Sequence, residues 1–229
     1  MHHNNVLLTK ILNSYNYEFI SRDDIIDVFN LCSELTKDYD KSHGIEHHVN
    51  VLINADKILN DELKYIYDNN DYILIVKLTL YATMLHDVLD KKYPKNMDLK
   101  KKEVNKFLIS KLNDQWINCN WIINNISFSS EKNNGYPIHD SPIVQKARDI
   151  CFDADKLEAI GEIGLKRCKE YKTATHPNCS SKEIDEIVLQ YCRENLIKVP
   201  NFLKTTSGKK LAVPLHTVIQ EFVEKHNEQ

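Results

Sequence analysis

The chain has 229 residues, of which 42% are hydrophobic and 28% are charged, and its formal net charge is −3. These values are typical of a folded globular domain and argue against disorder, a collagen-like repeat or a basic nucleic-acid surface. Only five glycines and six prolines are present, too few for the frequent turns of a β-sandwich or barrel. We therefore expect one all-α domain and no nucleic-acid partner.

Cysteine usage indicates the compartment. The chain is larger than the small secreted domains that depend on disulfides, and no two cysteines form a Cys-x-x-Cys motif. The first residues lack the basic and apolar regions of a signal peptide. We therefore expect reduced thiols in a cytoplasmic protein. The cysteines are Cys32, Cys119, Cys151, Cys168, Cys179 and Cys192.

Hydrophobic residues recur at helical spacing along most of the chain. Residues 1–20 form an N-terminal extension, either an added helix or a frayed tail, ahead of a domain at 21–229. Residues 129–142 contain many turn-forming residues, which predicts a loop. The expected helices cover residues 21–37, 43–60, 71–91, 98–112, 114–126, 142–152, 155–172, 181–198 and 205–226.

Residues 72–89 raise the question of a membrane span because they are mostly apolar. Lys77, His86 and Asp87 interrupt the segment, and a spanning helix needs about 20 predominantly apolar residues. A helix that is apolar on most sides is typical of the centre of a bundle. We therefore expect a buried core helix and no membrane partner.

The dipeptide His-Asp occurs twice, about as often as chance predicts. His86-Asp87 lies near the end of the most apolar helix, where burial of both groups is costly unless each finds a partner. A bound cation would satisfy them, and the negative end of the helix dipole would favour it. A structural His–Asp hydrogen bond or a helix end at the surface is the alternative. His139-Asp140 lies between two prolines and is expected in a solvated turn.

A second cluster of polar residues occupies positions 40–48. His43 and His47 are four residues apart and would share one face of a helix. With Glu46 they match the His-x-x-Glu-His pattern, in which the glutamate is the general base of a zinc peptidase. The alternative is a helix N-terminus capped by Ser42, with exposed histidines.

The third cluster, residues 153–164, combines carboxylates, an apolar helix face and two glycines. Gly161 and Gly164 would cost about 1 kcal/mol each inside a helix. Glycines at this spacing indicate the close approach of another backbone or of a ligand.

Together the three clusters resemble the HD-domain metal-dependent phosphohydrolases. The family motifs are SHDxxHxxRV, HDxxDxK followed by an aromatic residue, and DAD followed by a basic residue and LxAIGxIG. They match residues 42–51, 86–93 and 153–164, with weaker matches at 126–129 and 206–212. The resemblance spans about residues 25–225 and implies a single helical bundle of the HD type.

The resemblance also implies roles for individual residues. The mixed nitrogen and oxygen ligands suit one divalent metal ion, Mn in the first place, with Co, Ni, Fe, Mg and Zn as alternatives. A bound metal would lower the pKa of a water molecule that attacks phosphorus. The implied metal ligands are His47, His86, Asp87 and Asp155, the implied catalytic residues are Asp90 and Lys92, and the implied phosphate contacts are Lys92 and Lys156.

The implied activity is hydrolysis of a nucleotide or a similar small phosphorylated molecule, in the first place a nucleoside triphosphate to a monophosphate and pyrophosphate. A nucleotide-binding sensor without catalysis and a His-x-x-Glu-His metallopeptidase are the alternatives. Three positions depart from the family pattern, because Gly44 replaces Asp, Asn50 replaces Arg and Lys156 replaces the commoner Arg. The oligomeric state stays open, with a homodimer as one option.

Overall fold

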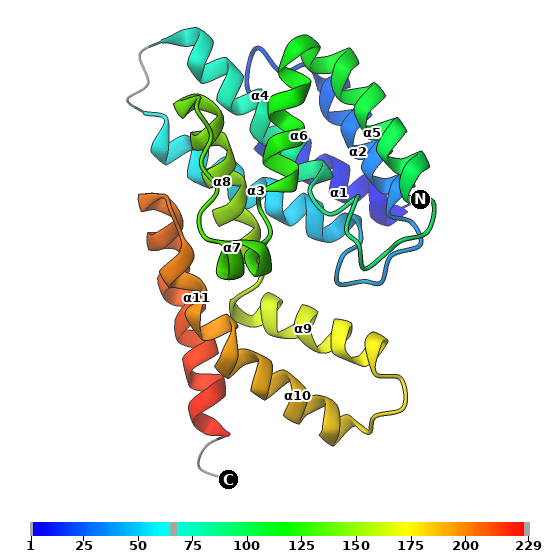
Figure 1. The fold of residues 1–229 in the computed structure, drawn as a ribbon, viewed down its shortest axis with the longest axis vertical. Helices are drawn as coiled ribbons and strands as arrows, with labels where there is room; N and C mark the ends of the chain where they lie inside the picture. Colours follow the sequence, from blue (N-terminus) through cyan, green and yellow to red (C-terminus); the bar gives the residue numbers. More distant parts are fainter. Residues whose placement is uncertain (1, 65–67, 227–229) are drawn as a thin grey trace.

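The computed structural model describes residues 2–64 and 68–226, and these ranges contain helices and no strand. The all-α prediction is therefore confirmed (Figure 1). The helices are α1 (His2–Ser14), α2 (Arg22–Leu35), α3 (Ile45–Glu62), α4 (Asn69–Leu85), α5 (Met97–Leu112), η1 (Asn113–Gln115), α6 (Trp116–Asn124), α7 (Phe128–Asn134), α8 (Pro142–Glu158), α9 (Gly161–Thr175), α10 (Ser181–Glu194), η2 (Leu196–Phe202) and α11 (Thr206–Lys225).

Helices α3, α4 and α8 pack against one another at the centre of the molecule. Every residue of α4 from Leu78 to Leu85 is buried, which confirms the predicted core helix. No helix in the described ranges is both long and apolar enough to cross a membrane. The central helices place the chain segments that carry all three sequence clusters beside one another.

The N-terminal extension is a docked helix. Helix α1 packs against α2 and α3, and Ile11 and Tyr15 are buried beneath it. The Tyr15 hydroxyl, just past the helix, donates a hydrogen bond to the Val76 carbonyl at 2.7 Å. The alternative of a frayed tail is therefore wrong for residues 2–14.

Several predicted boundaries are wrong. The helix predicted over 71–91 ends at Leu85, so His86 and Asp87 lie in the turn that follows it. The predicted loop at 129–142 begins with helix α7, because the Ser127 hydroxyl accepts a hydrogen bond from the Ser130 N–H and caps that helix.

The predicted break at residues 153–154 is also misplaced. Helix α8 continues to Glu158, and α9 starts at Gly161. Asp153 lies inside α8, where its carboxylate accepts hydrogen bonds from the Thr205 N–H and hydroxyl, both at 2.7 Å. This contact holds the N-terminus of α11 against α8, so the first Asp of the DAD motif has a structural role.

Both glycines of the third cluster are explained by backbone geometry. Gly161 has a φ of +76°, in the left-handed region that favours glycine. A Cβ at Gly164 would lie 2.2 Å from the Ala159 carbonyl oxygen. The predicted close approach of backbone is therefore confirmed at Gly164, and it brings the start of α9 against the end of α8.

Helices α9 and α10 lie below the bundle in Figure 1, side by side as a hairpin, and α11 runs down on the left from beside the bundle. The helix predicted over 181–198 ends at Glu194, and the 3-10 helix η2 leads into α11. Helix α11 contacts α8, α9 and α3 and so joins the hairpin to the core.

Candidate metal centre

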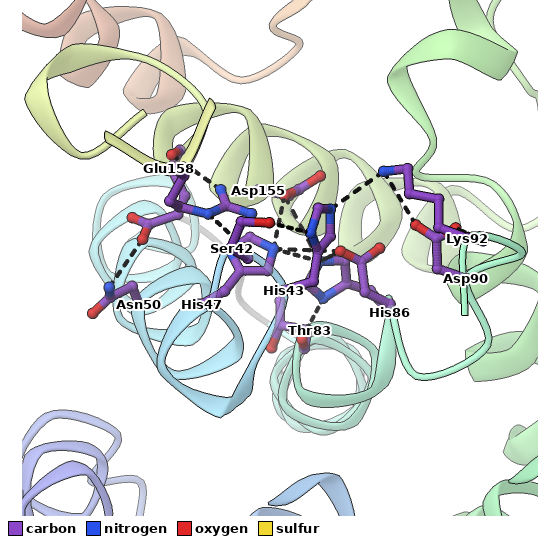
Figure 2. A network of polar contacts seen from close by, with 12 residues as sticks. Ser42, His43, His47, Asn50, Thr83, His86, Asp90, Lys92, Asp155 and Glu158 are labelled. Atoms are coloured by element: carbon purple, nitrogen blue, oxygen red, sulfur yellow. Dashed lines mark hydrogen bonds and ion pairs between the residues drawn. The ribbon is translucent and has the colours of Figure 1, made fainter. Parts of the chain in front are cut away.

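Two histidines and two aspartates from three parts of the chain lie close together, with both carboxylates near both histidine rings (Figure 2). The Nε2 atoms of His47 and His86 are 3.1 Å apart. A carboxylate oxygen of Asp87 lies 3.5 Å from His47 Nε2 and 3.3 Å from His86 Nε2. The corresponding distances for Asp155 are 3.5 and 3.7 Å. The structure therefore brings together all four residues that the sequence implied as metal ligands.

The three central helices position this cluster. His47 lies in the first turn of α3, Asp155 in the last turn of α8, and His86 and Asp87 directly after α4. Both histidine side chains are only 1% exposed. The ligand atoms are thus held by the best packed part of the fold, as a preorganised site requires.

The orientation of His86 is fixed by its second ring nitrogen. His86 Nδ1–H donates a hydrogen bond to the Thr83 carbonyl at 2.8 Å, which leaves the Nε2 atom facing the cluster. His47 Nδ1 is buried and has no hydrogen-bond partner within the described residues. Backbone contacts of this kind leave no signal in the sequence, so the part played by Thr83 could not be predicted.

The cluster attracts positive charge. Burial raises the pKa of Asp87, but the neighbouring histidines outweigh this and hold it well below its usual range. Burial lowers the pKa of His86, but Asp87 and Asp155 raise it to about 8. Burial, together with the Arg167 charge, lowers the pKa of His47, which is therefore a neutral imidazole. Two anionic carboxylates facing two imidazole nitrogens make a set of donors for a divalent cation.

Asp90 and Lys92 lie beside this cluster. Lys92 Nζ is 3.4 Å from an Asp90 carboxylate oxygen and 3.2 Å from His43 Nε2. The Lys92 N–H also donates to Asp90 at 2.8 Å. Lys156 pairs with Asp155, so both lysines implied by the resemblance face acidic groups of the site.

Asn50, which stands where the resembled motif has an arginine, has a carboxylate partner. Its amide donates to Glu158 at 2.9 Å, and its carbonyl oxygen accepts from Lys10 Nζ at 3.0 Å. Glu158 is 4% exposed, and burial raises its pKa. Helix α1 therefore supplies a cation, Lys10, next to Asn50. At Gly44 a Cβ would make only an ordinary 3.5 Å contact with the Asp40 carbonyl oxygen.

The interpretation of residues 42–48 as an exposed capped helix is wrong. Helix α3 is capped by Gly44 without a side-chain hydrogen bond, and His43, His47 and His48 are all buried. Glu46 is 62% exposed and pairs with His3 at 3.8 Å. His139, in the other His-Asp pair, is partly buried against the ring of Trp121.

A cavity of about 660 Å³ opens beside the cluster, between the bundle and the α9–α10 hairpin. His86, Asp87 and Asp155 line one part of it together with Asp90 and Lys92. Its volume is in the range of small-molecule sites. Ser127, Phe128 and Ser129, from the weaker sequence match at 126–129, also line it.

Several cavity residues were not predicted from the sequence. They lie on α9 and α10, outside the three motifs. The residues on α9 lie three or four positions apart, so they share one face of the helix. This spacing could have been recognised in the sequence. These residues are Arg167, Cys168, Tyr171 and Lys172 on α9 and Tyr191 on α10.

Comparison with known sequences finds a protein that is similar to part of this chain. No family model matches the chain. Over 159 residues it is 30% identical to the uncharacterized protein L803 of Acanthamoeba polyphaga mimivirus. The match covers 65% of this chain and 63% of the relative, so the chain spans less than two thirds of that protein's length.

Solved structures have the same fold. A Lactobacillus plantarum protein superposes with a TM-score of 0.70 at 22% identity, over 92% of this chain and 98% of its own. Bacillus subtilis YpgQ, crystallised in complex with ADP, gives a TM-score of 0.61 at 19% identity, over 88% and 96%. Lin1889 of Listeria innocua gives 0.59 at 18% identity, over 88% and 94%. The chain therefore has the helical fold of these bacterial proteins.

Proposed function

We propose that the protein is a metal-dependent phosphohydrolase that acts on a nucleotide or a similar small phosphorylated substrate, in the first place a nucleoside triphosphate. The observation that carries the proposal is the pair of imidazole Nε2 atoms, 3.1 Å apart, each of which lies 3.3 to 3.7 Å from one oxygen of Asp87 and one oxygen of Asp155. The residues that would hold a divalent ion are His47, His86, Asp87 and Asp155.

This donor set fits a first-row divalent metal ion, with Mn preferred because half of the ligands are carboxylates. The carboxylates are held anionic and His47 is held neutral, as a metal ion requires. His86, whose pKa is raised to about 8, would lose a proton when the metal binds. A bound metal would lower the pKa of a water molecule and withdraw charge from a phosphoryl oxygen.

The chain's own residues supply the remaining chemistry. The Asp90 carboxylate lines the cavity and would take the proton of the water that attacks phosphorus. The new P–O bond forms as the bond to the leaving group breaks, which releases pyrophosphate from a nucleoside triphosphate. Lys92 and Lys156 would neutralise the charge that develops on the phosphate oxygens. Arg167 and Lys172 extend this positive lining toward α9.

The nucleotide part of the proposal has its own support. The cavity volume suits a nucleotide, and the rings of Tyr171 and Tyr191 line it. Bacillus subtilis YpgQ, which has the same fold, was crystallised with ADP. The same features support the second candidate, a nucleotide sensor that binds without turnover. The exposure of Glu46 disfavours a metallopeptidase, in which this residue would be the general base.

The test is the release of phosphate and pyrophosphate from a panel of nucleoside mono- and triphosphates. The protein is stripped with chelator and refilled with Mn, Co, Ni, Mg or Zn, and His86→Ala is the inactive control. Metal-dependent release that the variant lacks is expected, and the product identifies the bond cleaved. Metal and nucleotide binding without release would favour the sensor. Loss of turnover in Glu46→Gln would favour the peptidase.

A further inference from the structure

A second group of ligand atoms lies beside the candidate metal centre. Within the described residues, atoms of His43, Asp87 and Asp90 lie within 4.8 Å of one another. One imidazole and two carboxylates suit a divalent cation. Asp87 belongs to both groups, and the four-ligand site leaves His43 unused.

A cation already lies at this second group. Lys92 Nζ is 3.2 Å from His43 Nε2 and 3.4 Å from an Asp90 oxygen (Figure 2). Burial opposes the lysine charge, but Asp90 and Asp87 outweigh it and raise the pKa of Lys92. The ammonium therefore faces an imidazole nitrogen and a carboxylate that a metal ion would need.

The orientation of His43 provides an independent observation. The Ser42 hydroxyl donates its single proton to Asp40, so it accepts a hydrogen bond from His43 Nδ1–H at 2.6 Å. Tyr93 donates to the other Asp40 oxygen and holds that carboxylate in place. This chain of hydrogen bonds places the lone pair of His43 on Nε2, toward Lys92. The imidazole is preorganised to bind a cation.

We propose that His43, Asp87 and Asp90 form a second cation site and that the Lys92 ammonium fills it, so that the centre binds a single metal ion. The inference rests on the proposed function, because it takes the four-ligand site as the first metal site. The ammonium blocks the lone pair of His43 and repels a second divalent ion. It supplies, close to the substrate, positive charge of the kind that a second ion provides in two-metal phosphatases.

The test counts metal ions in Lys92→Met, which removes the charge and keeps an unbranched side chain of similar length. Equilibrium dialysis against Mn²⁺ is expected to give one ion per wild-type chain and two per variant chain. The second ion should bind at least ten times more tightly to the variant than to the wild type. Electron paramagnetic resonance should detect magnetic coupling between the two ions in the variant.

Three control variants separate the site from general charge effects. Lys91→Met removes the same charge from the neighbouring exposed position and should keep one ion. Lys92→Arg retains a cation and should also keep one. Lys92→Met combined with Asp90→Asn removes a ligand of the second site and should return the count to one.

The possible results distinguish this inference from the proposed function. A Lys92→Met variant that saturates at one ion, or a wild type that binds two, would overturn the inference alone. A wild type that binds no Mn²⁺ would overturn the four-ligand centre, and with it this inference. Lys92 is partly exposed, so the variant should fold. If Lys92→Met does not fold, Lys92→Ala is a second variant, for which two Mn²⁺ ions per chain are also expected.

Discussion

The Nε2 atoms of His47 and His86 lie 3.1 Å apart although the two residues are 39 positions apart in the chain. Two imidazole nitrogens this close, next to Asp87 and Asp155, share one cation or one proton. Because Thr83 fixes the ring of His86 and α3 fixes His47, the pair depends on the packing of α3 against α4. The stability of the core and the geometry of the candidate centre are therefore linked.

Replacing Asp155 by Ala should abolish turnover with little loss of helix. The change removes one of two carboxylates from the centre. Even the loss of a residue that only hydrogen-bonds to a metal ligand lowers metal affinity or activity by about 10- to 100-fold. We therefore expect a loss of more than about 100-fold in phosphohydrolase activity. Steady-state assays with Mn²⁺ measure it, and circular dichroism measures helix content. Asp87→Ala should behave in the same way.

Asp140→Ala is the matched control for these variants. It changes the acidic residue of the other His-Asp pair, which is exposed in the loop before α8. Its activity should equal that of the wild type. Full turnover in both Asp87→Ala and Asp155→Ala would contradict the assignment of the metal ligands.

Asn50→Ala should destabilise the protein through Glu158. The Asn50 amide is the side-chain donor to this nearly buried carboxylate, and an unsatisfied buried polar group costs about 1–3 kcal/mol. We expect a fall of that size in the free energy of unfolding, measured by urea denaturation. Adding Glu158→Gln to Asn50→Ala removes the charge of the buried carboxylate and should recover part of the lost free energy of unfolding. Equal stability of Asn50→Ala and the wild type would mean that this pair contributes little.

The four residues of the candidate centre could be picked out from the sequence because the motifs carry them as short, local patterns. His86 and Asp87 are adjacent, and Asp155 lies within a twelve-residue segment with two glycines. The positions of most helices could also be predicted, since most helices have one apolar face. Contacts between residues far apart in the chain could not be predicted. The Lys10–Asn50–Glu158 series joins residues 40 and 108 positions apart through tertiary packing.

The breaks between helices were harder to predict than the helices themselves. A break between two helices was expected at residues 153–154, but Asp153 lies inside α8 and faces the start of α11. Helix α8 therefore continues past the expected boundary. The role of Lys92 was only partly predicted, because its contact with His43 requires the turn after α4 to fold back toward α3.

Asp56 should make the stability of the protein depend on pH in a defined direction. Its carboxylate is buried below α1, where Ser14 and Tyr17 donate to it at 3.2 and 3.0 Å. Burial raises its pKa despite these hydrogen bonds. The folded state thus holds the proton more tightly than the unfolded chain, whose Asp pKa is about 3.9. This contribution to stability is complete below that value and is lost as the pH rises through the folded pKa.

Asp56→Asn is the variant that isolates this effect. Its stability relative to the wild type should increase from about pH 4 upward and level off above the folded pKa. Urea denaturation at several pH values measures the difference, in which the contributions of other groups cancel. A difference that stays constant or decreases with rising pH would contradict the sign.

Gly164→Ala should destabilise the junction of α8 and α9 although alanine is the better helix former. The helix propensity gain is about 1 kcal/mol, but the new Cβ would lie 2.2 Å from the Ala159 carbonyl oxygen. Because that contact is with backbone, α8 and α9 must move apart, and overpacking of this kind costs about 1–3 kcal/mol. Thermal unfolding should record a net loss of stability. Gly44→Ala is a comparison variant: its Cβ would meet only an ordinary contact, so its loss of stability should be that of an N-cap glycine alone, up to about 1 kcal/mol. A Gly164→Ala variant as stable as the wild type would mean that the two helices can separate at no cost. In that case the cavity wall formed by α9 would be adjustable rather than fixed by this contact.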